Sequence, residues 1–240
     1  MRQSNLYVII FAIALTIVLG GLLSITSVGL KPLQDKQVEL DTKKKILGAV
    51  ITLDSEMTPE QVLQMYDDRV QSMLVDIDGN EVTNADITAE KVDIGKNHKI
   101  APEERLFPVF KYSNEAGELE AYIFPTFGAG LWDWISGFIA LEKDLNTIKG
   151  VAFDHKQETP GLGARITEAA VQARFQGKTI YEGSELVSVS MVKGEGNDGL
   201  SAHQVDGLSG ATMTAKGVNK MLESYLEYYQ GFIQKNKQSL

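Results

Sequence analysis

LFPVFKYSNEAGELEAYIFPTFGAGLWDWISGFIALEKDLNTIKGVAFDH, residues 106–155, indicates the fold class. Four runs in it have the length and the β-branched and aromatic content of strands: 106–112, 119–127, 134–141 and 147–155. Short polar or glycine-containing segments, such as Asn114 to Gly117, separate them. Strands joined by such short connections pair as antiparallel hairpins. The stretch therefore predicts an antiparallel sheet.

Helical patterns lie on both sides of these strands. Thr58 and Pro59 form a typical helix start, because Thr caps the first turn and Pro is favoured at the first helical position. Apolar residues at helical spacing extend this predicted helix: Val62, Leu63, Met65, Tyr66, Val70 and Met73. A second apolar series predicts a C-terminal helix that ends at Tyr229: Val218, Met221, Leu222, Tyr225, Leu226 and Tyr229. The predicted class is α+β, with helices flanking an antiparallel sheet.

Three shorter elements complete the prediction. Asp78 and Gly79 form the tight turn of a hairpin between two short apolar runs. Residues 166–175 are predicted to be helical, after the glycine-rich Pro160 to Gly163. Residues 186–193 alternate in polarity, as a further strand would.

The N-terminal segment from Leu6 to Leu30 is apolar and contains no Asp, Glu, Lys or Arg. A helix of this length covers about 37 Å, enough to cross a hydrocarbon core of about 30 Å. A cleaved signal peptide is the alternative, but its apolar region would be shorter, about 7 to 15 residues. We predict a transmembrane anchor at 1–30, a stalk helix at 31–50 and a globular domain at 51–240. The globular part forms either one domain or two lobes, about 51–105 and 106–240.

Composition restricts the chemistry of the globular part. Residues 31–240 hold 22 basic and 32 acidic side chains, a formal charge of −10, so nucleic acid is not an expected partner. The chain has no cysteine, which excludes disulfides, thiolate nucleophiles and cysteine-bound iron-sulfur clusters. No metal site is predicted, because three histidines lack the spacing of zinc ligands: His98, His155 and His203.

Residues 194–199, Gly-Glu-Gly-Asn-Asp-Gly, match the spacing of a dinucleotide-binding loop. The context does not fit that function. No helix is predicted to open after the third glycine, and Glu195 and Asp198 would bring negative charge next to a pyrophosphate. We interpret the segment as a flexible surface loop.

The segment Asp206 to Thr212, D-G-L-S-G-A-T, permits two interpretations. In the first, small residues turn the chain and a hydroxyl of Thr212 or Thr214 caps the C-terminal helix. In the second, the free N–H groups at the helix start bind a phosphate, and Gly210 lets a bulky group approach the Thr212 hydroxyl. The residues alone do not decide between them.

A resemblance favours the second interpretation. D-G-L-S-G-A-T is similar to the flavinylation motif of the FMN-binding domain family, in which a separate flavin transferase esterifies the FMN phosphate to the last threonine, here Thr212. Residues 128–141 (GAGLWDWISGFIAL) and 154–166 (DHKQETPGLGARI) resemble the C subunit of sodium-translocating NADH:quinone reductases, as does the single anchor. The flavin subunit of the Rnf electron-transport complex shares the E-T-P-G-L-G and S-G-A-T pieces and remains an alternative. A non-redox anchored extracytoplasmic binding domain is a second alternative.

The resemblance implies a set of residues around covalent FMN. Trp132 and Leu162 would pack on the isoalloxazine ring, although both could be ordinary core residues. Glu158 would offer a hydrogen bond unless it is a solvated loop charge, and Lys193 would approach the phosphate or a ring carbonyl unless it is a plain surface lysine. The rest of the implied pocket and attachment loop is Thr159, Gly163, Ser209, Gly210 and Ala211.

The resemblance also implies the reaction and the location. No general base, nucleophile or substrate pocket is evident, which fits an electron carrier between other integral membrane subunits of an NADH:quinone reductase that moves sodium. The family's flavin domain lies on the periplasmic face of the cytoplasmic membrane. The positive-inside rule opposes this, because only Arg2 precedes the anchor while Lys31, Lys36 and Lys43 to Lys45 follow it. We expect the periplasmic orientation.

Overall fold

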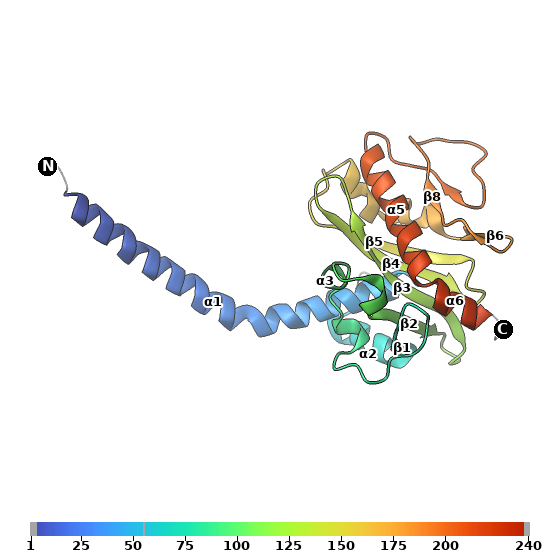
Figure 1. Cartoon of the computed structure of the whole chain (residues 1–240), viewed down its shortest axis with the longest axis horizontal. Coiled ribbons are helices and arrows are strands. Elements are labelled where there is room, and N and C mark those ends of the chain that lie inside the picture. The colour runs from blue at the N-terminus through green and yellow to red at the C-terminus, as the bar shows by residue number, and fades with distance from the viewer. Residues whose placement is uncertain (1–3, 55, 238–240) are drawn as a thin grey trace. The chain divides into compact units, whose positions relative to one another are not determined.

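The computed structural model describes residues 4–54 and 56–237. Its internal contacts divide the chain into two units, one that ends at Asp41 and one that begins at Thr42 (Figure 1). In the first unit the described residues from Asn5 onward are helical, and the second unit contains the whole sheet and the remaining helices.

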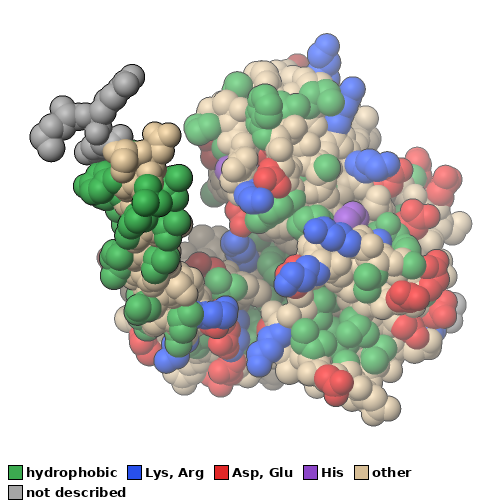
Figure 2. Space-filling view, turned by 60° about the vertical axis from the view of Figure 1, so that its left-hand side comes forward, with side chains coloured by type: hydrophobic (Ala, Val, Ile, Leu, Met, Phe, Trp, Pro, Cys, Tyr) green, Lys and Arg blue, Asp and Glu red, His purple; other side chains and the backbone are tan. Residues whose placement is uncertain are grey.

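Helix α1, Asn5–Gly48, covers most of the predicted anchor at 1–30 and of the predicted stalk at 31–50; residues 1–3 of the anchor lie outside the described residues. Pro32 lies inside the helix, where it has no N–H to donate, and yet the helix continues through it. The apolar side chains of the N-terminal part are exposed, and they cover that part of the helix in the space-filling view (Figure 2). Among the described residues, α1 is the one helix whose length and mean hydropathy of 2.8 suffice to cross a membrane.

The second unit is built on a five-stranded antiparallel sheet in the order β1-β2-β3-β4-β5. Its strands are β1 Val70–Val75, β2 Phe107–Ser113, β3 Leu119–Ala129, β4 Trp134–Glu142 and β5 Ile148–His155. The four predicted strands are confirmed, because β2 to β5 pair as consecutive hairpins. The predicted turn between β2 and β3 is also present, since Asn114 bonds to Gly117 and Glu118.

The first helix is shorter than predicted. Thr58 caps α2, Pro59–Arg69, and forms a capping box with Gln61, as the sequence indicates. The predicted continuation to Met73 is wrong, because Val70 opens β1 and pairs with Tyr112 of β2. Strand β1 comes from the first of the two suggested lobes and pairs with a strand of the second, so both lie in one compact unit.

The hairpin predicted at Asp78 and Gly79 is reduced to its turn. Gly79 has a positive φ of 75° and donates its N–H to Asp76, but among the described residues the returning chain pairs through one bridge, from Glu81 to Val75. Short helical segments then lead to β2: η1 Ala89–Lys91, α3 Ile94–Asn97 and η2 Pro102–Glu104.

Two further elements differ from the prediction. The helix expected at 166–175 is divided at Glu168, whose backbone is extended, into η3 Gly163–Thr167 before it and the consecutive short helices α4 Ala169–Gln172 and η4 Ala173–Phe175 after it. The strand expected at 186–193 is interrupted by Ser188, whose φ is 58°. Leu186 instead ends the short strand β7, Glu185–Leu186, and residues 190–191 form β8, Ser190–Met191. Strand β7 pairs with β6, Tyr181–Glu182, and β8 pairs with β9, Gln204–Val205.

The C-terminal helix is confirmed as α5, Thr212–Tyr228, and is followed by α6, Gln230–Lys237, which was not predicted. Both helices lie across one face of the sheet (Figure 1). Gly217 allows the close approach of α5 to β3, since a Cβ there would lie 2.4 Å from the Ala129 carbonyl oxygen. The apolar residues predicted to face the sheet are buried: Val218, Met221, Leu222, Tyr225, Leu226 and Tyr229.

Deleting residues 1–30 is expected to leave a folded, soluble domain. The compact unit begins only at Thr42, and the deletion removes no residue of its core. A formal charge of −10 on residues 31–240 also favours solubility. Thermal unfolding followed by circular dichroism should show one cooperative transition; a product recovered only in aggregates would mean that the anchor completes the core.

Candidate functional site

Three segments far apart in sequence meet at the Glu158 carboxylate. Glu158 follows β5 and is only 4% exposed, so the interpretation as a solvated loop charge is wrong. Its Oε1 accepts hydrogen bonds from the backbone N–H groups of Leu131, at 2.8 Å, and Trp132, at 3.1 Å. Its Oε2 accepts from the Thr214 hydroxyl at 2.5 Å. One carboxylate therefore joins the β3–β4 loop, its own loop and the first turn of α5.

Two glycines make room for this carboxylate. A Cβ at Gly130 would lie 2.5 Å from Glu158 Oε1. A Cβ at Gly163 would lie 2.4 Å from both Glu158 Oε2 and the Thr214 hydroxyl oxygen. Contacts this short would force the side chains apart, so the G-L-W and G-L-G segments need glycine here for close packing.

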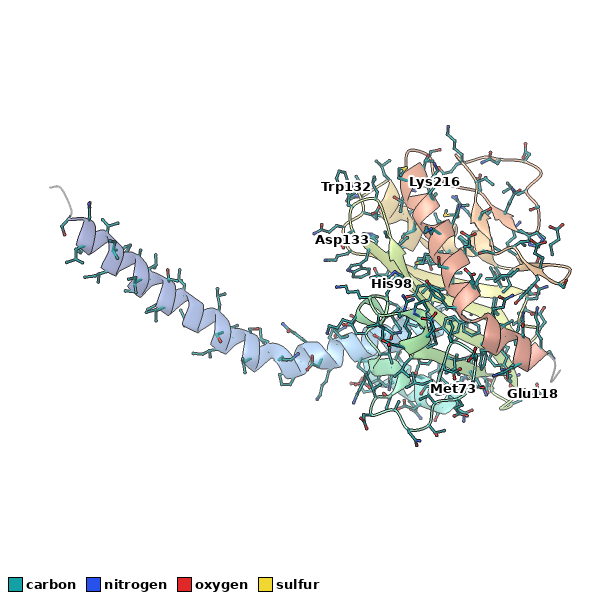
Figure 3. All side chains as sticks on the ribbon, in the orientation of Figure 1. Met73, His98, Glu118, Trp132, Asp133 and Lys216 are labelled. Atoms are coloured by element: carbon teal, nitrogen blue, oxygen red, sulfur yellow. The ribbon has the colours of Figure 1, made fainter. Side chains whose placement is uncertain are left out.

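The segments that meet at Glu158 carry exposed apolar side chains. Trp132 is 68% exposed, and its indole Nε1–H donates to the Thr159 hydroxyl at 3.1 Å, which fixes the ring although it faces solvent. It lies at the same end of the fold as Lys216 of α5 (Figure 3). Trp132 and Leu162 are thus not core residues. Together with two other exposed side chains they form what we term the apolar rim: Leu131, Trp132, Leu162 and Met213.

Helix α5 begins at Thr212 without a side-chain cap. The N-cap residue is the buried Ala211, and the Thr214 hydroxyl bonds to Glu158, so the interpretation of Thr212 or Thr214 as a helix cap is wrong. The Ala215 N–H donates to the carbonyl oxygen of the N-cap residue Ala211, as the first bond of an α-helix does. The N–H groups of Thr212, Met213 and Thr214 therefore have no intrahelical acceptor and carry the positive end of the helix dipole.

The turn before Thr212 packs on the apolar rim. Gly210 has a φ of 76°, and a Cβ there would lie 2.8 Å from Cδ2 of Leu162. Ser209 and Gly210 are exposed, and Thr212 is partly exposed. The Thr212 hydroxyl is thus close to the solvent-exposed rim, at the N-terminal end of a helix.

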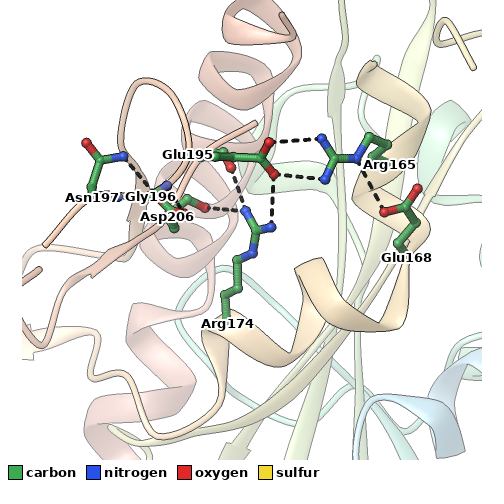
Figure 4. A network of polar contacts seen from close by, with 8 residues as sticks. Arg165, Glu168, Arg174, Glu195, Gly196, Asn197 and Asp206 are labelled. Carbon is green, nitrogen blue, oxygen red and sulfur yellow. Dashed lines mark hydrogen bonds and ion pairs between the residues drawn. The ribbon is translucent and has the colours of Figure 1, made fainter. Parts of the chain in front are cut away.

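A network of charged side chains connects the glycine-rich loop at 194–199 to the segment Asp206 to Thr212. Glu195 of the glycine-rich loop forms ion pairs with Arg165, at 2.8 Å, and Arg174, at 3.0 Å, and lies between them (Figure 4). Hydrogen bonds from Arg165 and then Arg174 lower the pKa of the Glu195 carboxyl from 4.5 to about 2, and the backbone of Ser209 also bonds to it. Residues 194–199 form a loop, as predicted, but Glu195 attaches it to the chain around Thr212.

Asp206, the first residue of the motif, belongs to the same network. Its carboxylate accepts from the N–H groups of Gly196, at 2.7 Å, and Asn197, at 3.2 Å, and the side-chain bond from Asn197 lowers its pKa. Arg174 donates to the carbonyl oxygens of Asp206 and Gly207. The roles of Arg165, Arg174 and Glu195 were not predicted, because nothing in their sequence spacing relates them to the motif.

Lys193 is exposed at the end of the segment that contains β8. Its carbonyl oxygen accepts from the Asn197 side chain. Within the described part of the chain, its ammonium group forms no hydrogen bond or ion pair with Thr212 or Glu158. The structure therefore brings together the other predicted site residues but does not join Lys193 to them.

Comparison with known proteins agrees with this arrangement. The FMN-binding domain family model matches residues 130–227, from the β3–β4 loop to the end of α5. The C subunit of the Na(+)-translocating NADH-quinone reductase of Pseudomonas aeruginosa is 30% identical, over 94% of this chain and 92% of the relative. The chain belongs to this family of C subunits. The corresponding protein of Neisseria meningitidis serogroup A is 32% identical, over 88% of this chain and 85% of the relative.

Solved structures of these C subunits share the fold. The one from Parabacteroides distasonis has a TM-score of 0.73 and 33% identity, covering 85% of this chain and 96% of that one. NqrC from Shewanella oneidensis has a TM-score of 0.73 and 27% identity, covering 84% and 99%. Membership of the family favours the sodium-pump resemblance over the Rnf-type and non-redox alternatives, and it agrees with a single-pass membrane protein.

The residues present fit an FMN group. The unpaired N–H groups at the start of α5 suit a phosphate, and the apolar rim suits the flat, largely apolar face of an isoalloxazine ring. The matched FMN-binding domain contains the whole arrangement around Glu158 and Thr212. Which of these residues contact the flavin stays a prediction.

Proposed function

We propose that this chain is the flavin-carrying electron-transfer subunit of a Na+-translocating NADH-quinone oxidoreductase, with FMN attached through its phosphate to Thr212. The observation that supports the attachment site most directly is the position of Thr212, partly exposed at the uncapped start of α5 and next to the apolar rim. A hydroxyl at this position is open to modification and lies among N–H groups that stabilise a phosphate.

Attachment would be made by a separate flavin transferase that acts on the segment Asp206 to Thr212. The bond that forms joins Thr212 Oγ1 to the phosphorus of the flavin mononucleotide unit. The bond that breaks joins that phosphorus to a leaving group of the donor, such as the nucleotide half of a flavin dinucleotide, and the hydroxyl proton passes to a base. Fixing the segment through Arg174 and Asp206 would present one conformation to the transferase.

An ester through the phosphate leaves the isoalloxazine ring, which supplies one- and two-electron chemistry when bound, chemically unchanged. The residues of this chain would then only place the ring and control its surroundings. Trp132 provides a flat indole whose orientation is fixed by the bond to Thr159, and Leu162 provides an apolar contact on the side of Gly210. Such pre-formed contacts reduce the side-chain conformational entropy that is lost when the ring binds.

The relatives' names place them in a reductase that moves sodium and transfers electrons from NADH to quinone. In such a complex this chain would receive electrons from one membrane partner and pass them to another. Its work would then be placement rather than acid–base or nucleophilic catalysis, which agrees with the lack of an evident general base in the sequence.

The experiment that tests the proposal is production of the full chain with and without a flavin transferase. The intact mass should increase by FMN less one water only when the transferase is present, and the purified protein should then be yellow. An unchanged mass in both preparations would refute covalent attachment, and a colourless protein from its native membrane would refute the redox role.

For the orientation in the membrane, the proposal follows the family and places the second unit on the periplasmic side. The chain has no cysteine, so a single introduced one reports cleanly. Ala116→Cys, in the exposed β2–β3 turn, should react with a membrane-impermeant maleimide in intact spheroplasts. Ser4→Cys, just before the apolar run that begins at Leu6, is the matched control and should react only after lysis. The reverse pattern would show that the charge count, not the family, predicts the topology.

A further inference from the structure

The carboxylate of Glu158 is buried, and its hydrogen bonds leave it little capacity to serve a ligand directly. Two oxygens have about four acceptor positions, and donors of this chain occupy three of them: the Leu131 N–H, the Trp132 N–H and the Thr214 hydroxyl. Only 4% of the residue is exposed. Direct contact between this carboxylate and a bound flavin is therefore not its main role.

Each bond of Glu158 reaches a different part of the candidate site. The bonds to Leu131 and Trp132 fix the loop that carries the exposed indole. The bond to Thr214 fixes the first turn of α5, two residues beyond the acceptor hydroxyl of Thr212. The chain of Glu158 itself continues into Thr159, which holds the indole, and Leu162, which packs against Gly210.

Packing alone would not favour a charge here. A buried carboxylate is costly unless several donors stabilise it, and an apolar side chain of similar volume would fill the space with less penalty. The three donors and the positive end of the α5 dipole offset that cost. What a carboxylate provides, and an apolar residue does not, is directional bonds that set the positions of three segments relative to one another.

We propose that Glu158 is a positioning residue for flavin attachment and placement, which joins the indole loop to the helix that carries Thr212. The inference rests on the proposed function and deepens it, because it names the residue that fixes the position of the acceptor hydroxyl relative to the side chains proposed to contact the ring. Misplacing a reacting group by about 1 Å can reduce a rate about 100-fold. Loss of these bonds should therefore slow attachment more than it lowers stability.

The first test uses a pair of substitutions at Thr214. Thr214→Val keeps the shape of the side chain and removes the hydroxyl that donates to Glu158, whereas Thr214→Ser keeps that hydroxyl. Each full-length variant is incubated with purified flavin transferase and flavin donor, and covalent incorporation is followed by intact mass at a temperature well below both unfolding midpoints. Thr214→Ser should react at the unsubstituted rate, and Thr214→Val should be slower by about tenfold.

The second test uses Glu158 itself and does not depend on flavin. In a Trp134→Phe background Trp132 is the only tryptophan, so its fluorescence anisotropy reports how firmly the indole loop is held. Glu158→Ala should lower the anisotropy and slow attachment by more than about tenfold. Glu158→Gln, whose amide oxygen can still accept from the two N–H groups, should keep the anisotropy near the unsubstituted value.

The outcomes separate this inference from the proposed function. If the unsubstituted chain takes up no flavin, the proposed function fails, and the anisotropy still tests the positioning role. If Thr214→Val and Thr214→Ser react at the same rate, or folded Glu158→Ala keeps its rate and anisotropy, the positioning role is refuted. If Glu158→Ala does not fold, the Thr214 pair decides alone.

Discussion

Thr212→Val is expected to abolish covalent flavin completely while leaving the fold intact. Valine keeps the β-branched shape and removes only the hydroxyl that forms the ester. Because Thr212 is partly exposed and its side chain caps no helix, the free energy of unfolding should change by less than about 1 kcal/mol. After co-expression with the transferase, a denaturing gel viewed under ultraviolet light should show a dark Thr212→Val band.

Thr167→Val is the matched control for this substitution. It removes an exposed threonine hydroxyl that donates to the nearby Ala164 carbonyl, outside the segment Asp206 to Thr212. Its band should fluoresce as strongly as the unsubstituted protein. A fluorescent Thr212→Val band would place the attachment elsewhere, and loss of fluorescence in both variants would point to a general effect of removing hydroxyls.

Gly207→Ala is expected to have the largest effect on stability. A Cβ at Gly207 would lie 1.8 Å from the Val192 carbonyl oxygen and 2.8 Å from that of Gly194, so backbone must move on both sides. Overpacking of this kind costs about 3 kcal/mol or more. For a domain of this size that loss lowers the unfolding midpoint by about 10 °C. Scanning calorimetry of the domain without residues 1–30 measures the shift.

Gly48→Ala is the control for this prediction. Gly48 ends α1, and a Cβ there would meet no atom within 4 Å. Alanine has the higher helix propensity, so the midpoint should stay unchanged or rise slightly. Equal midpoints for Gly207→Ala and the unsubstituted domain would show that the loop before Thr212 can relax, and that Arg174 and Asp206 do not hold it.

The sequence predicted the regular parts of the fold because their patterns extend over many residues. The four strands from β2 to β5 and helix α5 each repeat their period often enough to exclude other structures. The end of α2 could not be placed in the same way. Val70 and Met73 fit a helix as well as a strand, and it is pairing with Tyr112 and neighbouring residues of β2 that makes them β1.

Local backbone geometry accounts for the other differences. Alternation at 186–193 predicted one strand, but the positive φ of Ser188 divides it, and no side-chain pattern announces that angle in a serine. Likewise the extended backbone of Glu168 divides the predicted helix at 166–175 into short turns. Neither of these backbone angles produces a pattern of side chains that can be read from a single sequence.

The candidate site, too, was predicted only in part from the sequence. Resemblance identified Thr212, Trp132 and the E-T-P-G-L-G segment, and the structure brings these together around Glu158. The resemblance did not indicate that Glu158 is buried, because the residues next to Glu158, Gln157 and Thr159, are exposed and polar, as is typical of a loop. The network of Arg165, Arg174 and Glu195 depends on contacts across 21 and 30 residues of sequence and leaves no local signal.

Peptide mass spectrometry of the flavin-loaded chain tests the central claim most directly. Trypsin cleaves after Lys193 and Lys216 and releases residues 194–216 as one peptide, which contains the hydroxyls of Ser201, Ser209, Thr212 and Thr214. We predict that this peptide carries the mass of FMN less one water and that fragmentation assigns the added mass to Thr212. An unmodified 194–216 peptide, or a flavin on any of the other three hydroxyls, would contradict the account.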